Sequence, residues 1–207
     1  MLPEVTLSLA LYDYLPILIW VAGSYFLVDA IREDINRVFF YYILILSLAL
    51  VCSGGILKAT WKLLIALADI NLLILSDMQF PLMGTGFFLL FISLLTLLLQ
   101  KKEIQEKKFA IGVFKKFFLP LVVVGSIGST ICLILIAKRK KAFHALIFYS
   151  IFLVVSTSMG YIGSRIVANS YNVILLEQTI NCSSTLLWAL GSFFLWKNHL
   201  KADVIKS

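Results

Sequence analysis

Long apolar runs follow one another almost without interruption from about Leu15 to about Trp196. Hydrophobic residues make up 61% of the 207 residues and charged residues only 14%, which is less polar surface than a soluble domain of this size needs. A helix that crosses a hydrocarbon core of roughly 30 Å needs about 20 apolar residues. The chain is therefore predicted to be an all-α, polytopic membrane helix bundle, because continuous apolar runs fit helices rather than the alternating strands of a barrel.

The apolar runs predict seven or eight membrane-spanning helices, in a single integral membrane domain over residues 1–207 with no soluble catalytic domain and no cleavable signal peptide. Because Glu177, Gln178 and Asn181 make the middle of the last span polar, that span is either one tilted helix or two helices over 165–180 and 182–197. The predicted spans are 13–31, 38–57, 60–78, 80–100, 117–137, 142–163 and 167–197.

Two segments of the chain, 10–100 and 115–198, echo each other at an offset of about 106 residues. These echoes suggest a 4+4 internal repeat, although apolar sequence also produces such matches by chance. In a true repeat of four helices, both halves would have the same orientation, and a substrate would bind near the interface between them. The matched segments are Leu15-Pro16 with Leu119-Pro120, Phe40-Tyr41 with Phe148-Tyr149, and Phe87-Phe88-Leu89 with Phe193-Phe194-Leu195.

The positive charges of the chain cluster in loops, which bears on orientation. The basic loop 100–116 carries six lysines, and Lys197, Lys201 and Lys206 follow the last span. If both lie in the cytoplasm, the positive-inside rule is satisfied, which predicts a cell or inner membrane protein with both termini cytoplasmic. The basic loop 138–141 then faces outward and disagrees. These loops are expected to contact anionic lipid headgroups and not nucleic acid.

A polar stripe interrupts the third predicted span. At 100° per residue, Lys58, Lys62, Asp69 and Ser76 fall within about 40° of one another. Asp69 is predicted near mid-span, where a carboxylate costs at least about 2.5–3.5 kcal/mol. It is read either as an ion-, proton- or substrate-binding group, or as a structural aspartate bonded to a neighbouring helix. The two lysines are expected to extend toward the interface.

The seventh predicted span carries a second stripe, in which Arg165, Asn169 and Asn172 share one face while Glu177 lies on another. This segment is also polar enough to be an interfacial helix. If both stripes face inward, they line one water-accessible cleft. The sequence then allows Lys58 or Lys62 to pair with Glu177, or Arg165 to pair with Asp69 or Asp77, without choosing between them. The candidate binding residues are Lys58, Lys62, Asp69, Ser76, Arg165, Asn169, Asn172 and Glu177.

The remaining chemistry-bearing residues give no catalytic, cofactor or metal assignment. His144 and His199 are far apart in sequence, and Cys52, Cys132 and Cys182 have no CxxC partner, so neither metal-ligand spacing nor a redox motif is present.

Other residues are assigned to the membrane interface or to helix packing. Asp13 and Asp29 are predicted to lie at the interface, with Asp29 paired to Arg32 three residues later. Gly125 and Ser129 are four residues apart and are predicted to let two helices approach closely.

One stretch is similar to the membrane lysoplasmalogenase family. It comprises Ala68-Asp69-Ile70-Asn71-Leu72, followed by Phe80-Pro81-Leu82-Met83-Gly84 and Phe87. The resemblance implies eight helices and an intramembrane lipid hydrolase. It covers about 25 residues, with Ala68 in place of the family's motif glycine and Phe91 near its histidine. The family's second acidic motif has at best Ser183-Ser184 here.

Three functions follow from these readings. The preferred one is a small transporter-like or solute- or ion-binding bundle. The alternatives are a non-catalytic membrane subunit or sensor scaffold, and a lipid-acting hydrolase distantly similar to lysoplasmalogenases. The sequence leaves open whether the chain pairs with a second copy or with another membrane protein.

Overall fold

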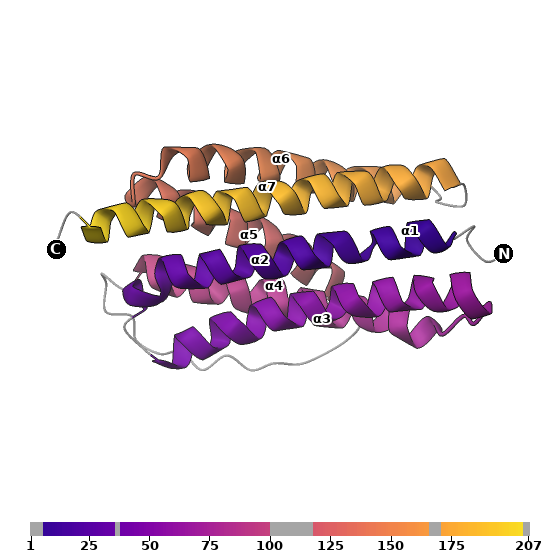
Figure 1. Cartoon of the computed structure of the whole chain (residues 1–207). Coiled ribbons are helices and arrows are strands. Elements are labelled where there is room, and N and C mark those ends of the chain that lie inside the picture. The colour runs from indigo at the N-terminus through magenta and orange to yellow at the C-terminus, as the bar shows by residue number, and fades with distance from the viewer. Residues whose placement is uncertain (1–5, 36–37, 100–117, 166–170, 205–207) are drawn as a thin grey trace.

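The computed structural model describes residues 6–35, 38–99, 118–165 and 171–204. These residues form seven α-helices and a short 3-10 helix, with no strand among them. Figure 1 shows the helices lying side by side as long rods. Their bounds are α1 Leu7–Tyr12, α2 Tyr14–Ile31, η1 Arg32–Asp34, α3 Val38–Ala68, α4 Leu73–Leu99, α5 Phe118–Arg139, α6 Phe143–Arg165 and α7 Tyr171–Val204.

Five of these rods are long and apolar enough to cross a bilayer. They are Leu7–Asp34, Val38–Ala68, Leu73–Leu99, Leu121–Arg139 and Asn172–Lys201, and a shorter apolar segment, Phe143–Ser158, lies in α6. The prediction of an all-α, multi-pass membrane bundle is therefore confirmed. The count of seven or eight spans and the 4+4 repeat are not confirmed.

The separate span predicted over 60–78 is wrong, because α3 runs unbroken from Val38 to Ala68 and α4 begins at Leu73. The chain turns at Asp69, whose φ of 56° lies in the left-handed region. The Asp69 N–H donates to the Ile65 carbonyl at 3.1 Å, and the Ile70 N–H donates to the Leu64 carbonyl at 3.3 Å. These bonds satisfy carbonyls that the helix end leaves free, so Asp69 is a helix C-cap and not a mid-span residue.

The break between α1 and α2 has a local cause in Pro16. A proline inside a helix removes one N–H donor, and its ring clashes with the carbonyl four residues earlier. For Pro16 that carbonyl belongs to Tyr12, the last residue of α1. Asp13 is therefore the residue at the break, between two nearly continuous helices.

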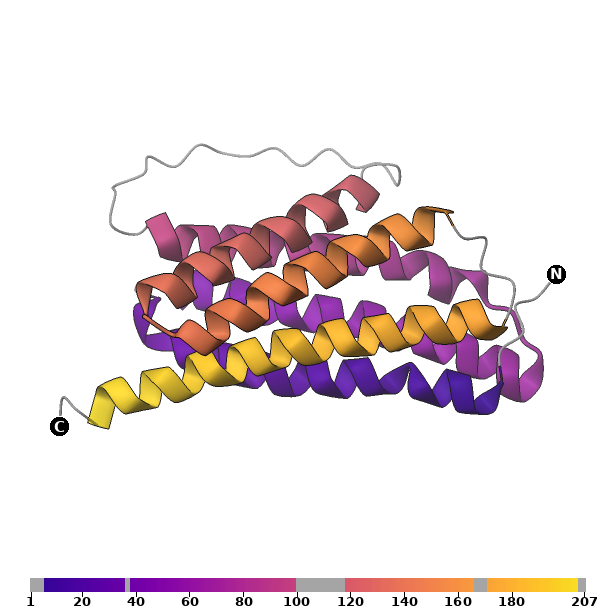
Figure 2. The same cartoon turned by 90° about the horizontal axis from the view of Figure 1, so that it is seen from above.

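The helices form a closed ring in the order α2, α3, α4, α5, α6, α7, with α7 packing back against α2. The α2–α3 and α5–α6 seams are the loosest of the ring, whereas α3–α4 and α4–α5 pack most extensively. Figures 1 and 2 show this arrangement from two directions. The interior of the ring is where a binding site in such a bundle would lie.

Helices α4 and α5 run in the same direction. Gly125 of α5 packs against the backbone of Phe87 in α4, and Gly128 packs against Phe91 further along α4. The end of α4 and the start of α5 therefore lie at opposite ends of the bundle (Figure 2).

Helices α2 and α7 are also parallel. Trp20 stacks on Trp188 with ring centroids 4.0 Å apart, and Phe26 meets Phe193 at 5.3 Å. Two three-helix units, α2–α4 and α5–α7, thus run in the same directions, and the echoed sequence pairs fall on α2 and α5, α3 and α6, and α4 and α7.

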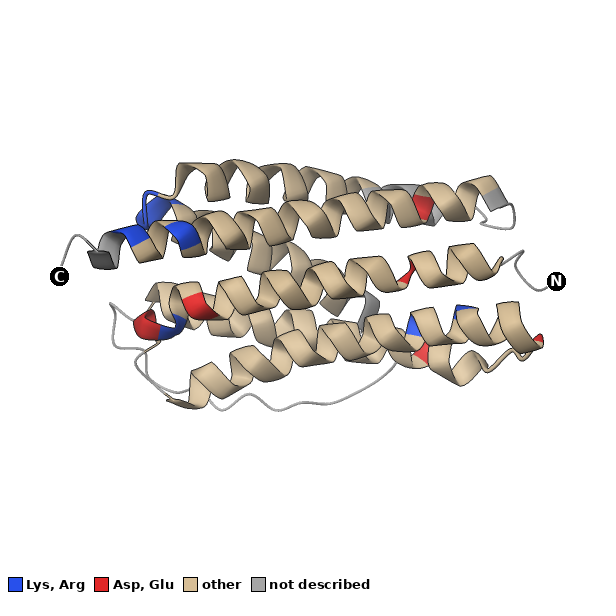
Figure 3. Cartoon of the chain, viewed as in Figure 1, with Lys and Arg blue, Asp and Glu red and all other residues tan. Residues whose placement is uncertain are grey.

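The described charges gather at the two ends of the bundle and leave its middle apolar (Figure 3). At the end where α7 finishes, Lys140 donates from Nζ to the Ala30 carbonyl at 2.7 Å, and Asn198 donates to the Lys140 carbonyl at 2.8 Å. Loop 138–141 therefore lies at the same end as Lys197 and Lys201. Loop 138–141 and the C-terminal lysines therefore no longer disagree, whereas the basic loop 100–116 lies outside the described residues.

Two further predictions concern the ends of the bundle. The pair of Arg32 with Asp29 is confirmed at 3.0 Å. The start of α1 and the end of α7, however, lie at opposite ends (Figure 1). Because α4 and α5 run in the same direction, the strict up-and-down alternation that predicted both termini on one side does not hold.

Candidate functional site

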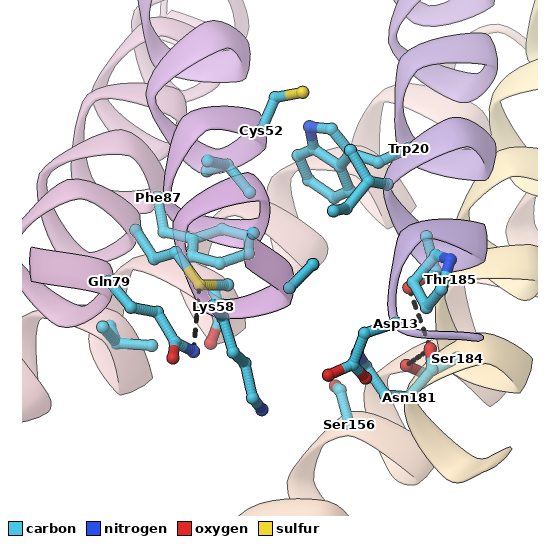
Figure 4. A pocket seen from close by; sticks show the side chains of 18 of the residues that line it. Asp13, Trp20, Cys52, Lys58, Gln79, Phe87, Ser156, Asn181, Ser184 and Thr185 are labelled. Atoms are coloured by element: carbon cyan, nitrogen blue, oxygen red, sulfur yellow. Dashed lines mark hydrogen bonds between the residues drawn. The ribbon is translucent and has the colours of Figure 1, made fainter. Parts of the chain in front are cut away.

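A cavity of about 260 Å³ lies inside the ring, and helices α2 to α7 all contribute to its wall. Figure 4 shows that α3 and α4 form one side while α2, α6 and α7 form the other. Its deep part is apolar and aromatic, with Trp20, Val51, Phe87 and Phe152. Its other part is polar, so the cavity is amphipathic, as small-molecule sites usually are.

Two ion pairs lie beside the polar part of the cavity. Lys62 Nζ is 2.7 Å from Asp13 Oδ2, and both side chains are only 6% exposed. Lys58 Nζ is 3.1 Å from Glu177 Oε1, with exposures of 25% and 34%. Asp13 and Lys58 line the cavity directly, and Figure 4 shows both of them at its open part.

The geometry of α3 explains how this helix forms ion pairs with both the α1–α2 break and α7. Lys58 and Lys62 are four residues apart on α3, so they lie one turn apart on the same face. Lys62 reaches the α1–α2 break, where Pro16 places Asp13, and Lys58 reaches Glu177 on α7. The four charges balance, and they tie α3 to the neighbouring α1–α2 break and, across the cavity, to α7.

The wall opposite the lysines carries uncharged polar groups from α5, α6 and α7. The hydroxyls of Ser184 and Thr185 donate to the Asn181 carbonyl at 2.9 and 2.8 Å, and Ser156 donates to the Leu153 carbonyl at 3.2 Å. A hydroxyl that donates in this way keeps two acceptor lone pairs. These groups can therefore accept hydrogen bonds from a solute without giving up their own.

Gln178 is a further polar group near this wall. It lies three residues before Asn181 on α7 and is 2% exposed, and among the described residues neither of its amide atoms has a hydrogen-bond partner. Buried amides are almost always satisfied. Gln178 does not belong to the described residues that line the cavity, so it is not counted among the groups of the site.

The structure brings together three of the residues singled out from sequence. Lys58 and Glu177 pair as one of the proposed alternatives had it, and Lys62 is buried beside them. Asp69, Ser76 and Asn172 are placed in the α3–α4 connection, the first turn of α4 and the first turn of α7, outside the described residues that line the cavity. The side chain of Arg165 and the whole of Asn169 lie outside the described residues.

Several groups of the site were missed by sequence reasoning. Asp13 was assigned to the interface, whereas its side chain is buried against Lys62. The signal that could have found it is Pro16, which breaks the helix at this position and opens a place for an inward carboxylate. Ser126, Ser156 and Thr185 were not singled out as binding residues, and Ser184 was named only within the resemblance, because small hydroxyl residues are common in packed membrane helices.

Replacing Asp69 by glycine is expected to leave the fold intact and to stabilise it by about 1 kcal/mol. A residue other than glycine pays roughly 1–2 kcal/mol in the left-handed conformation, and glycine is the usual residue at such a cap. Thermal unfolding of the purified protein in detergent would measure the change. A large loss of stability would show that the Asp69 carboxylate has a structural partner.

No protein-family model, curated protein or solved structure matches this chain. The similarity to lysoplasmalogenases therefore has no support from these comparisons. The geometry does not favour it either, since Asp69 and Asp77 are both exposed and Glu177 is engaged by Lys58.

Proposed function

We propose that this chain is a transporter-like membrane bundle that binds a small solute in the cavity enclosed by α2 to α7. The observation that carries the proposal is an amphipathic cavity inside the bundle with a buried ion pair, Lys62 with Asp13, at its polar end. Charged side chains within membrane helices are costly, and they commonly mark ion or substrate pathways. Of the candidates from sequence, Lys58, Lys62 and Glu177 are the ones we retain for this role.

The halves of the chain support the same proposal. We infer a repeat of the units α2–α4 and α5–α7, because the echoed sequence pairs fall on corresponding helices that run in the same directions. In transporters built from such repeats, the solute binds at the interface between them. The cavity takes its lining from both units. This repeat has three long helices per unit where the sequence suggested four.

For orientation, we infer that the end carrying Lys138, Arg139, Lys197 and Lys201 faces the cytoplasm, since positive loops stay inside. The polar end of the cavity, beside Asp13 and Lys58, would then open to the opposite side. Loop 138–141 would contact anionic headgroups at the cytoplasmic surface. We infer that the chain resides in a cell or inner membrane.

A non-catalytic scaffold is the second candidate, and one observation favours it. All four charges at the polar end of the cavity are paired within the chain. In a scaffold, the function of these pairs is to hold the helices together. The two functions differ in whether water and solutes reach the cavity.

Cys52 lines the cavity and offers a test of access. In a Cys132→Ser/Cys182→Ser background, a membrane-impermeant cationic methanethiosulfonate reagent is expected to modify Cys52 from the side opposite the basic loops, and not from the other side. Sealed vesicles of both orientations, analysed by mass spectrometry, would measure this. A metabolite that occupies the cavity should then slow the reaction, which allows a panel of zwitterionic, anionic and cationic metabolites to be screened.

Two single-cysteine variants calibrate the measurement. Cys132 is 3% exposed, so a protein that retains only this cysteine should not react. Asn172→Cys in a cysteine-free background lies on the exposed first turn of α7 and should react readily. If Cys52 behaves like Cys132 from both sides, the cavity is closed to water and the scaffold function is favoured.

A further inference from the structure

A second hollow lies on the outside of the bundle, between α2 and α3. It is a groove of about 360 Å³ with an almost entirely apolar lining. Trp20, Val21 and Tyr25 of α2 form one wall, and Ile45 and Ala49 of α3 belong to the other. It follows the α2–α3 seam, one of the loosest in the ring.

The groove and the central cavity share two lining residues, Trp20 and Cys52. These two side chains therefore lie between the deep end of the cavity and the outside of the bundle. Trp20 Nε1 donates to the Leu48 carbonyl across the seam at 3.3 Å, and Figure 4 shows the Trp20 ring extending from α2 toward the Cys52 side. A rotation of Trp20 away from Leu48 would join the two spaces.

The groove faces the hydrocarbon of the membrane. Val21 and Tyr25, which belong to its rim, are 51% and 66% exposed, and they lie in a span of membrane-crossing length. Within the groove, the buried hydroxyl oxygen of Ser24 has no hydrogen-bond partner among the described residues. Because its rim is exposed on a helix of membrane-crossing length, the groove adjoins lipid chains when the protein lies in a bilayer.

We propose that the ligand of the central cavity is a single-chain amphiphile, whose polar head lies beside the two ion pairs and whose hydrocarbon chain leaves through the α2–α3 groove. This inference rests on the proposed function, because it requires a ligand in the cavity. It adds the substrate class and the route of entry, which is sideways from the bilayer.

The distance between the ion pairs and the start of the groove fits a single-chain amphiphile. Asp13 lies seven residues before Trp20 on nearly continuous helices, which is about 10 Å along the axis. Lys58 lies six residues after Cys52 on α3, or about 9 Å. The head would thus lie near the end of the bundle and the chain near mid-membrane, as in one leaflet of a bilayer. Two lysines and two carboxylates balance one another, so a zwitterionic head can exchange partners with them without leaving an unpaired charge.

Cys52 again supplies the test, because it lines both spaces. In the Cys132→Ser/Cys182→Ser background, two reagents are compared in reconstituted vesicles: the cationic methanethiosulfonate reagent, which comes from water, and N-dodecylmaleimide, which dissolves in the bilayer. Ala49→Trp, which fills the groove from α3, is expected to slow the maleimide reaction at least about tenfold and to leave the aqueous reaction unchanged. Val154→Trp, on the exposed face of α6, is the matched control and should change neither.

A homologous series of alkyl-dimethylglycine betaines tests the ligand class with a constant zwitterionic head. The decyl compound is expected to protect Cys52 from the aqueous reagent, the ethyl compound is not, and Ala49→Trp should abolish the protection. Val21→Trp, which narrows the groove from the α2 wall, serves as a second variant if Ala49→Trp does not fold.

The outcomes separate this inference from the proposed function. Equal protection by ethyl and decyl betaines, or a maleimide reaction that Ala49→Trp leaves unchanged, overturns the lateral entry while the solute-binding cavity stands. A Cys52 that the aqueous reagent never reaches overturns the cavity itself, and with it both proposals.

Discussion

Replacing Lys62 by methionine is expected to destabilise the bundle by about 3–5 kcal/mol, because it leaves the buried carboxylate of Asp13 without its partner. Both side chains of this pair are 6% exposed, so water cannot compensate for the lost ammonium group. The free energy of unfolding, measured by denaturant titration in mixed micelles with circular dichroism as the signal, would give the magnitude.

Two comparisons show whether the loss comes from an unpaired charge. Lys58→Met removes the partner of Glu177, whose side chain is 34% exposed, so its effect should be much smaller, as for pairs near solvent. The double variant Asp13→Asn/Lys62→Met removes both charges of the buried pair and should recover most of the stability lost by Lys62→Met. Asp13→Asn alone completes the cycle. If the stability losses of Asp13→Asn and Lys62→Met simply add in the double variant, the pair is not coupled and the unpaired charge is not the cause.

The contrast between the two lysines and Asp13 shows what sequence can predict in such a bundle. Lys58 and Lys62 share a face because α-helix geometry is local, and their spacing alone places them together. The partner of each lysine is decided by which helices pack together. Apolar surfaces of nearly uniform composition do not specify those partners, so Glu177 was one of several alternatives and Asp13 was not considered.

Helix ends were predicted poorly for a related reason. Span prediction counts apolar residues, and apolar residues lie on both sides of the Asp69 turn as well as along the middle of α3. The chain turns where the last backbone groups of the helix are capped. At Asp69 the cap is formed by a left-handed residue and two local hydrogen bonds, neither of which hydropathy reports. A boundary drawn from hydropathy therefore put this carboxylate inside the membrane, and the apparent stripe through Asp69 and Ser76 followed from that boundary.

The relation between the two halves of the chain could be predicted only in part from the sequence. Local echoes such as Leu15-Pro16 and Leu119-Pro120 occupy matching positions at the starts of α2 and α5. The parallel packing of α4 on α5 has no signature in composition, because it depends on close contacts between glycines and a neighbouring backbone. Of these contacts, the face containing Gly125 was predicted as a packing surface, and the structure assigns it to α4.

Gly125→Ala is expected to destabilise the protein by about 1–3 kcal/mol through overpacking of the α4–α5 interface. A Cβ atom at this position would lie 2.7 Å from the carbonyl carbon of Phe87 and 2.7 Å from the amide nitrogen of Phe88. These are backbone atoms, which cannot rotate away as a side chain can, so the two helices would have to separate along this contact. Thermal unfolding in detergent, followed by circular dichroism, would measure the loss.

Gly55→Ala is the matched control, because the same atoms are added within a helix. Its Cβ would meet Ile17 Cγ1 at 3.2 Å, and this flexible side chain can shift by the few tenths of an ångström required. Alanine favours a helix over glycine by about 0.8–1.0 kcal/mol, so this variant should be as stable as the parent protein or slightly more so. Because the propensity gain is common to both variants, the difference between them isolates the contact of α5 with α4. Equal stability of the two variants would mean that α4 and α5 do not pack backbone to backbone at Gly125, and that the ring which encloses the cavity is arranged differently.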